Sequence, residues 1–502
     1  MRGWYTLKQQ LIKYPQPATK GDPMTSHYSH LVAHETIPSG KLEVKAPYDD
    51  SLIATVDTVD SLAIEHALGV ASKLFNDRSR WLSAAERIEI LQRLAQLMQQ
   101  NAERLTQLAA REGGKPLKDS QVEMDRAIDG VHSCVECLRN NHGEEIPMGI
   151  NAASMNRLAM TQHEPIGVVV AVSAFNHPIN LIVHQVGPAI AAGCPVIIKP
   201  ANDTPLSCYE LVALLHQAGL PAEWAQVVTP ENHEVAEQLV TDNRVGFFSF
   251  IGSASVGWML RSKLAPGARC ALEHGGVAPV IVEADADLEG ILPLLAKGGF
   301  YHAGQVCVSV QRVYAQRKIA REVAEKLGEL GKAMTVGDPT SADTDVGPLI
   351  RHAETDRVAD WVEQAIADGA EKVAGEGKLS ASCYSPTVLL NPPHTADVSC
   401  KEIFGPVICV YEYDEIDEAI QHANALDVAF QASICTRNLD SAMHAYRRLN
   451  ASAVMINDHT AFRVDWMPFA GLRHSGMGVG GIPYTFEDMQ IKKLMVIKSN
   501  SL

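Results

Sequence analysis

Cysteine is scarce in this sequence, and long apolar runs are missing. Ten cysteines are spread over 502 residues, which is too dilute for a disulfide scaffold and fits a reducing compartment. The most apolar stretch, residues 166–175, contains a glycine and a serine and is shorter than the roughly 18 to 20 residues that cross a bilayer. We therefore expect a cytoplasmic protein of reduced thiols that has no membrane span.

An excess of positive charge is also lacking. Lysine and arginine number 43 against 59 aspartates and glutamates, a net charge of -16, which argues against nucleic acid or an anionic membrane as the main partner. Hydrophobic residues at 46% and charged residues at 20% exclude a disordered, collagen-like or coiled-coil chain. No internal repeat or low-complexity tract occurs. Small-molecule chemistry is the favoured class of function.

The first 23 residues have neither the apolar core nor the small-residue cleavage site of a secretory signal. We predict that residues 1–23 form a disordered tail. Met24 begins a segment typical of an ordinary N-terminus, so an upstream or misassigned start codon is an open alternative.

Metal-ligand spacing is absent as well. Cys134 and Cys137 form the one CxxC, and no second pair or histidine pair follows at ligand distance, which favours a packed helical segment over zinc. We expect no metal site.

The pattern of apolar residues predicts a helical N-terminal third followed by two α/β runs. Helices are expected over residues 61–75, 84–111 and 120–139. From Ile166, buried strands alternate with helical stretches, as in a parallel sheet of a nucleotide-binding unit. The predicted elements of this run are strands 167–171, 195–198 and 245–250 and helix 205–218. The elements of the second run are strands 280–282, 310–315, 407–410 and 433–435 and helix 353–367.

Two β-like segments, residues 154–163 and 491–498, lie outside both runs. Their edges need partners, which a subunit interface would supply. This predicts a homodimer or homotetramer.

Three short segments carry candidate chemistry. Cys307 lies in Gly-Gln-Val-Cys-Val, Glu273 in Leu-Glu-His-Gly-Gly, and Asn176 follows an apolar strand. Each has an ordinary structural alternative: Cys307 as inert core, Glu273 as a cap or ion-pair partner, Asn176 as a turn residue before Pro178. Together they offer a nucleophile, a general base in an apolar setting and a side-chain donor for an oxyanion.

These segments, with several others in the same order, resemble the aldehyde dehydrogenase superfamily over nearly the whole chain after about Lys45. The supporting stretches are Ala85-Glu-Arg87, Gly114-Lys-Pro-Leu117, Val196-Ile-Ile-Lys-Pro-Ala-Asn202, Phe250-Ile-Gly-Ser-Ala-Ser-Val-Gly257, Gly347-Pro-Leu349, Lys401-Glu-Ile-Phe-Gly-Pro406, Asn457, Met467-Pro-Phe469 and Ser475-Gly476. Each motif alone is weak, but their common order makes coincidence remote.

The resemblance implies a mechanism. Cys307 would attack the aldehyde carbon as a thiolate, and the oxyanion would lie between the Asn176 amide and the Cys307 backbone N–H. Loss of a hydride to the nicotinamide leaves a thioester, which a water activated by Glu273 hydrolyses to the acid. Relatives that pass the acyl group to coenzyme A generally lack this glutamate, so we expect hydrolysis. A coenzyme A-acylating enzyme and a non-catalytic structural or binding member are the alternatives.

The resemblance also implies a site for NAD or NADP, on a variant Rossmann unit without GxGxxG. Lys199 would reach the adenosine ribose, Glu402 the nicotinamide ribose, and Phe404 would pack beside the nicotinamide. The full predicted set is Phe175, Lys199, Asn202, Gly252, Ser253, Gly257, Glu402 and Phe404. Because NAD-preferring members commonly have glutamate where Asn202 stands, we expect NADP to be accepted.

The substrate side departs from the family pattern. His302 replaces a common asparagine, and His177 stands where an aromatic residue is frequent. The stretch from Asn457 to Pro468 resembles the subgroup acting on small hydroxylated or anionic aldehydes, with Arg463 as the one candidate for an anion contact. An ion pair of Arg463 with Asp465 or another loop acid is an equal alternative.

The fold implied by the resemblance is α/β, with a variant Rossmann cofactor domain, an α/β catalytic domain and a small β extension for oligomerisation. We expect the cofactor domain over residues 24–148 and 166–274, the catalytic domain over 275–481, and oligomerisation segments over 149–165 and 482–502.

Overall fold

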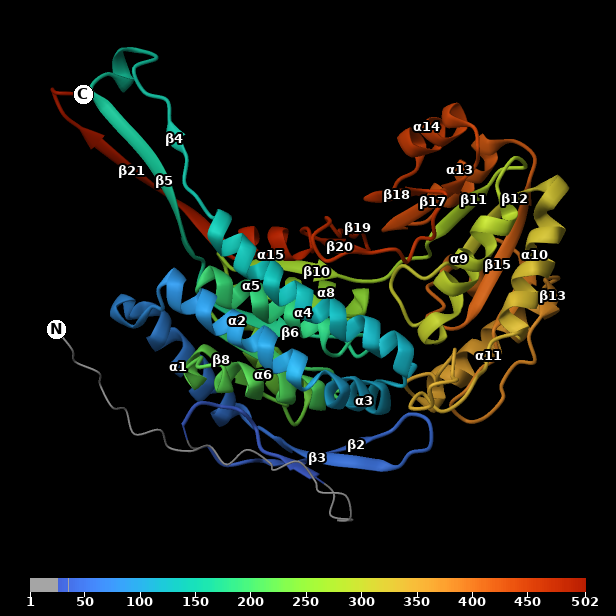
Figure 1. Ribbon diagram of the computed structural model, residues 1–502, viewed down its shortest axis with the longest axis horizontal. Coiled ribbons are helices and arrows are strands. Elements are labelled where there is room, and N and C mark those ends of the chain that lie inside the picture. Colours follow the sequence, from blue (N-terminus) through green and yellow to red (C-terminus); the bar gives the residue numbers. More distant parts are fainter. Residues whose placement is uncertain (1–25, 35) are drawn as a thin grey trace.

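The computed structural model describes residues 26–34 and 36–502, so the tail predicted for residues 1–23 lies outside the described part. Two large α/β units lie side by side, and a narrow β arm extends from one of them (Figure 1). The predicted α/β class is confirmed.

The first unit is built on a six-stranded sheet of order β20-β10-β9-β6-β7-β8. Five strands are parallel, and β20 runs antiparallel to β10. Their bounds are β6 Val168–Val172, β7 Val196–Lys199, β8 Ala225–Val227, β9 Val245–Ile251, β10 Arg269–Glu273 and β20 Gly476–Met477. The central strands are apolar throughout because helices cover both faces of the sheet. These helices are α1 Ser61–Asn76, α2 Ala84–Gln100, α3 Ala102–Gly113, α4 Leu117–Asn140, α5 Asn180–Ala192, α6 Leu206–Gln217, α7 His233–Thr241, α8 Ala254–Arg261 and α15 Ile482–Asp488.

The second unit contains a seven-stranded sheet of order β13-β14-β15-β12-β11-β17-β18. Its strands are β11 Pro279–Val282, β12 Arg312–Gln316, β13 Glu371–Ala374, β14 Thr387–Leu390, β15 Val407–Tyr413, β17 Gln431–Cys435 and β18 Ala453–Ile456. Its helices are α9 Leu288–Phe300, α10 Arg317–Lys332, α11 His352–Ala367, α12 Asp397–Cys400, α13 Ile416–Asn424 and α14 Leu439–Arg448. The predicted strands and helices of both α/β runs are present.

The prediction of one continuous helix over residues 84–111 is wrong, because two helices, α2 and α3, cover this range. The chain leaves helical geometry at Asn101, with φ -107° and ψ 9°, and α3 starts at the next residue. The Asn101 side chain donates to the Leu97 carbonyl at 2.8 Å, which also accepts the Asn101 backbone N–H at 3.1 Å, so Asn101 closes the last turn of α2. Cys134 and Cys137 both lie in α4, and Cys134 is fully buried, so the packed-helix interpretation is confirmed.

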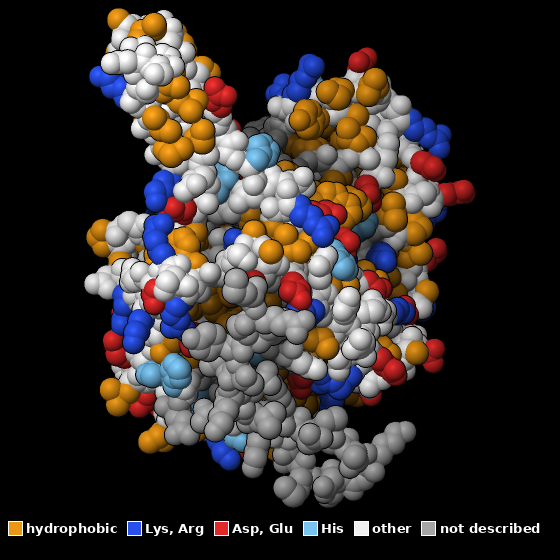
Figure 2. Space-filling model, turned by 60° about the vertical axis from the view of Figure 1, so that its left-hand side comes forward, with side chains coloured by type: hydrophobic (Ala, Val, Ile, Leu, Met, Phe, Trp, Pro, Cys, Tyr) orange, Lys and Arg blue, Asp and Glu red, His pale blue; other side chains and the backbone are white. Residues whose placement is uncertain are grey.

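The two segments predicted to need partners from another subunit pair largely with each other. β5 Arg157–Pro165 and β21 Gln490–Lys498 form an antiparallel ladder from Pro165 opposite Gln490 to Arg157 opposite Lys498. β4 Glu145–Ile146 pairs with Met160 and Ala159 on the other edge of β5. Within the described residues β21 and β4 are therefore the edge strands of this sheet, and the apolar side chains of β21 are half exposed. Apolar atoms gather on this arm at the upper left of Figure 2.

The remaining strands are short and peripheral. They are β1 Ser26–Tyr28, β2 Gly40–Lys45 and β3 Leu52–Thr58 in one sheet and β16 Val428–Ala429 and β19 Leu472–Arg473 in another. Among residues 26–34 and 36–502, no helix is both long and apolar enough to span a membrane.

Candidate active site

The predicted site residues of the first unit lie at one edge of its sheet. Lys199 ends β7, Glu273 ends β10, Gly252 follows β9, and Asn176 lies a few residues after β6. Because parallel strands present their carboxyl ends at the same edge, residues distant in sequence meet there. The loop that carries Cys307 reaches this edge from the second unit.

Cys307 is partly buried beside a small apolar cluster that includes Val308, Phe430 and Phe469. Burial raises the pKa of its thiol to about 12, the charge of Arg463 lowers it, and Glu402 and Glu273 raise it. The thiol is therefore protonated at rest, and three charged residues from different segments lie close to it.

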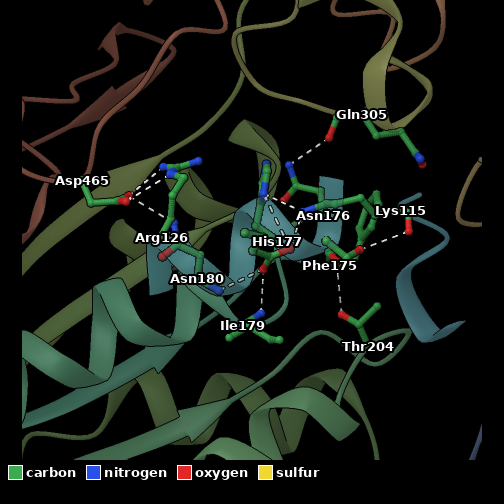
Figure 3. A network of polar contacts seen from close by, with 12 residues as sticks. Lys115, Arg126, Phe175, Asn176, His177, Ile179, Asn180, Thr204, Gln305 and Asp465 are labelled. Carbon is green, nitrogen blue, oxygen red and sulfur yellow. Dashed lines mark hydrogen bonds and ion pairs between the residues drawn. The ribbon is translucent and has the colours of Figure 1, made fainter. Parts of the chain in front are cut away.

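Asn176 is held against the Cys307 loop. It is buried, and its Nδ2 donates to the backbone carbonyl of Gln305 at 2.9 Å (Figure 3). Gln305 is itself fixed, since its Oε1 accepts the Ile350 N–H at 2.9 Å. Gly304 has φ 69°, and a Cβ there would lie 2.1 Å from the Gly405 carbonyl oxygen, so this turn requires glycine. One amide hydrogen of Asn176 stays free for another acceptor.

Glu273 occupies a pocket shaped for its side chain. A Cβ on Gly480 would lie 2.1 Å from Glu273 Oε1, so glycine at that position makes room for the carboxylate. Burial raises the pKa of Glu273, and the charge of Arg463 lowers it. A carboxyl with a raised pKa suits a general base better than an ordinary surface acid does.

Arg463 lies over the ring of Phe469, with the guanidinium carbon 3.6 Å from the ring centroid. Its Nη2 lies 3.3 Å from His184 Nδ1, and its buried Nε has no hydrogen-bond partner in the described chain. Burial lowers its pKa, and Glu273 raises it. An N–H without a partner at this position is available to an anionic or polar group.

The ion pair considered between Arg463 and Asp465 is absent from the described structure. Asp465 is bound instead by Arg126, whose Nε and Nη2 donate to it at 3.1 and 2.7 Å. Asn180 and His184 add hydrogen bonds of 3.1 and 2.7 Å. These contacts hold the pKa of Asp465 well below its usual range. The negative charge of Asp465 is therefore already balanced by Arg126.

Glu402 has the properties expected of a ribose ligand. Its Oε1 is buried without a partner in the described structure, and burial raises its pKa to about 8. A Cβ on Gly275 would lie 1.7 Å from the same oxygen. Phe404 meets Phe175 edge to face at 5.9 Å between ring centroids.

The other predicted cofactor residues lie around β7 and α8. Lys199 Nζ donates to Asn202 Oδ1 at 3.1 Å, and burial lowers the pKa of Lys199 to about 8. Ser253 precedes α8 without capping it through its side chain, which leaves the helix N–H groups to another acceptor. A Cβ on Gly257 would lie 2.1 Å from His274 Cε1. These features fit a dinucleotide.

The two unusual histidines lie together. The rings of His177 and His302 meet edge to face at 6.2 Å. His302 is fully buried, has φ 50°, and neither of its ring nitrogens has a partner in the described chain. Lys115, Glu123 and Arg126 complete this region and were not predicted as site residues. Lys115 belongs to a recognised motif, but nothing in the sequence indicates its contacts.

Metal chemistry finds no support in the geometry. Across the part of the chain that the structure describes, no group of three or more His, Cys, Asp or Glu side chains is arranged to hold a metal ion.

The comparisons agree with this architecture. The aldehyde dehydrogenase family model matches residues 34–494. The 3-sulfolactaldehyde dehydrogenase of Priestia megaterium is 37% identical over 457 residues, which are 91% of this chain and 95% of the relative.

Solved structures match over almost the whole chain. Aldehyde dehydrogenase 21 from Physcomitrella patens, in complex with the reaction product succinate, has a TM-score of 0.91 at 32% identity, covering 95% of this chain and 100% of that one. Glyceraldehyde-3-phosphate dehydrogenase from Methanocaldococcus jannaschii, complexed with NADP, has a TM-score of 0.88 at 32% identity, covering 92% and 100%.

The fold and the matched sequence define an oxidoreductase that acts on the aldehyde group. The chain belongs to the aldehyde dehydrogenase family.

Proposed function

We propose that this protein oxidises a small polar or anionic aldehyde to the carboxylic acid with NAD or NADP, through a thioester on Cys307. The observation that carries the proposal is the convergence of Cys307, Glu273 and Arg463 at one point, where each alters the pKa of another. The Asn176 amide is held beside the same loop.

The first half-reaction forms the carbon–sulfur bond. Cys307 gives its proton to solvent water and attacks the carbonyl carbon as the thiolate, and the resulting oxyanion accepts hydrogen bonds from the free Asn176 N–H and the Cys307 backbone N–H. The positive charge of Arg463 favours the thiolate. NAD or NADP, which Glu402, Lys199 and Asn202 would hold, would supply the acceptor for the hydride of the thiohemiacetal carbon.

The second half-reaction cleaves that bond. Glu273 takes a proton from a water molecule, which adds to the thioester carbonyl, and collapse expels the Cys307 thiolate with the acid as product. Asn176 stabilises this second oxyanion as it does the first. The raised pKa of Glu273 makes the carboxylate a stronger base.

Cofactor binding is supported by the unpaired Glu402 oxygen and by the Lys199–Asn202 contact. Because Asn202 Oδ1 accepts from Lys199, its NH2 group remains free to donate to a ribose hydroxyl or a 2′-phosphate. The adjacent acid, Asp203, is paired with Arg351, which reduces its repulsion of a phosphate. NADP acceptance follows.

The polar substrate is supported by Arg463, whose Nε lacks a partner, and by the sulfonated aldehyde in the name of the Priestia relative. We further propose a cytoplasmic homodimer or homotetramer, with the apolar face of β21 in the subunit contact. We also propose the domain division given above with one change, that β20 and α15 belong to the cofactor domain, because both pack on the first unit.

The test measures NAD(P)H and product for a panel of aldehydes with and without coenzyme A. We expect hydrolysed acid in both cases, with the hydroxylated and anionic aldehydes preferred. Cys307→Ala should abolish turnover, whereas Cys270→Ala, at a partly exposed thiol on β10, should leave it intact. Acyl-coenzyme A as the main product, or turnover by Cys307→Ala, would overturn the proposal.

A further inference from the structure

A buried chain of polar groups ends at His177, next to Asn176. Lys115 is 1% exposed and forms an ion pair with Glu123, which is 2% exposed. The Lys115 Nζ also lies 2.7 Å from His177 Nδ1. The other carboxylate oxygen of Glu123 accepts the backbone N–H groups of Ile179 and Asn180, both at 2.9 Å. Glu123 therefore anchors both the start of α5 and the lysine.

The direction of the hydrogen bond between Lys115 and His177 is the same wherever the proton shared by Lys115 and Glu123 lies. If Lys115 and Glu123 are charged, the ammonium donates to both of its neighbours. If the proton lies on Glu123, its hydroxyl donates to the lysine nitrogen, which still has N–H groups for His177. Glu123 Oε2 is 3.9 Å from His177 Nδ1, too far for a hydrogen bond. In either case His177 Nδ1 accepts, and the ring proton of neutral His177 is on Nε2.

His177 stays neutral in this setting. Its pKa is lowered well below the usual range by burial and by the charges of Lys115, His302, Arg126 and Arg463. Its Nε2 has no hydrogen-bond partner among the described residues and is not one of the buried atoms, since 15% of the side chain remains exposed. The Nε2–H of His177 is therefore not taken by another group of the described chain, and Arg463 is close enough to act on the charge of this ring.

We propose that His177 is a substrate-specificity residue that donates from Nε2–H to an oxygen of the aldehyde's substituent, and that Lys115 and Glu123 are positioning residues that fix its tautomer. The ligand class is an aldehyde with a hydroxyl or an ionised acid oxygen close to the carbonyl, rather than an alkyl aldehyde of equal length. This inference rests on the proposed aldehyde oxidation. A site with an otherwise unsatisfied donor discriminates strongly against a substrate without the acceptor.

The test compares kcat/KM within matched pairs, 2-hydroxypropanal against propanal and succinic semialdehyde against butanal. His177→Phe keeps a ring but removes the donor, so the preference for the oxygenated aldehyde should fall by about tenfold or more, while the alkyl aldehydes change little. His177→Gln can place an amide N–H near the Nε2 position and should restore much of the preference.

The positioning role is tested with the double variant Lys115→Met, Glu123→Gln, which leaves no buried charge unpaired. The native preference should be independent of pH from about pH 6 to pH 9. In the double variant the Nδ1–H tautomer becomes accessible, so the preference should weaken at neutral pH and recover as the pH falls, because protonated imidazole donates from both nitrogens. A purely structural role would lower all rates equally without this pH dependence.

Unchanged preference in His177→Phe, or an equal loss for both members of each pair, would overturn the inference. A different result, oxidation of none of the four aldehydes by the native protein, would refute the proposed function itself.

Discussion

Gly480 offers a way to displace the proposed general base without changing it. A Cβ at this position would lie 2.1 Å from Glu273 Oε1 and 3.0 Å from the Phe469 carbonyl oxygen. Gly480 and Phe469 also exchange backbone hydrogen bonds of 2.7 and 3.0 Å, which fix the backbone. In Gly480→Ala the shift therefore falls on the Glu273 side chain, which must move by roughly 1 to 1.5 Å to restore van der Waals contact.

A misplacement of about 1 Å costs on the order of a hundredfold in a step that depends on the displaced group. That step is thioester hydrolysis, because Glu273 activates the water. Steady turnover of Gly480→Ala should fall by about a hundredfold, while the first turnover stays fast. Rapid mixing should then show a burst of NAD(P)H approaching one per site.

The matched control is Gly69→Ala in α1, where the added Cβ has only the far end of Arg244 at 3.9 Å. Alanine favours a helix over glycine by about 1 kcal/mol, so this variant should fold and turn over normally. Native turnover in Gly480→Ala, or loss of the burst together with hydrolysis, would refute the assignment of Glu273 to the second half-reaction.

Three further results are expected. Because burial raises the pKa of Cys307 to about 12 and only the thiolate reacts, alkylation of Cys307 by iodoacetamide should accelerate steadily with pH up to about pH 9. The alkylation should be slower in Arg463→Met. A plateau of the rate near neutral pH would contradict this. Asn202→Glu should shift kcat/KM toward NAD, because a carboxylate repels the 2′-phosphate, and a native preference for NAD of about a hundredfold would show that another group closes the phosphate pocket. Deleting the residues after Gln490 removes nearly the whole ladder with β5 and should give monomer or aggregate by light scattering, and an active soluble monomer would refute the oligomer proposal.

The sequence predicted those parts of the fold that depend on local patterns. The buried strands of both sheets and the helix containing Cys134 and Cys137 follow from apolar periodicity, and all are present. The break at Asn101 was missed because both flanking helices have the same apolar period. The Asn101 side chain bonds the last turn of α2, a contact that the periodicity does not show.

The network around the site was not predictable, because its contacts join residues far apart in the chain. Arg126 and Asp465 are separated by 339 positions, and the contact of Lys115 with His177 depends on how the start of α4 packs beside the turn after Asn176. Without that packing, the histidine at position 177 is only an unusual residue in a pocket. The pairing of β5 with β21 is hidden for the same reason.

The proposed mechanism requires a covalent acyl intermediate on Cys307, which is hydrolysed by water that Glu273 activates. The most direct measurement is intact-protein mass spectrometry of Glu273→Gln mixed with NAD(P) and an oxygenated aldehyde, followed by proteolysis to locate the adduct. We expect a mass increase equal to one acyl group, located on the peptide containing Cys307 and absent from Glu273→Gln, Cys307→Ala. An unmodified protein that has formed NAD(P)H, or an adduct on another residue, would contradict the claim.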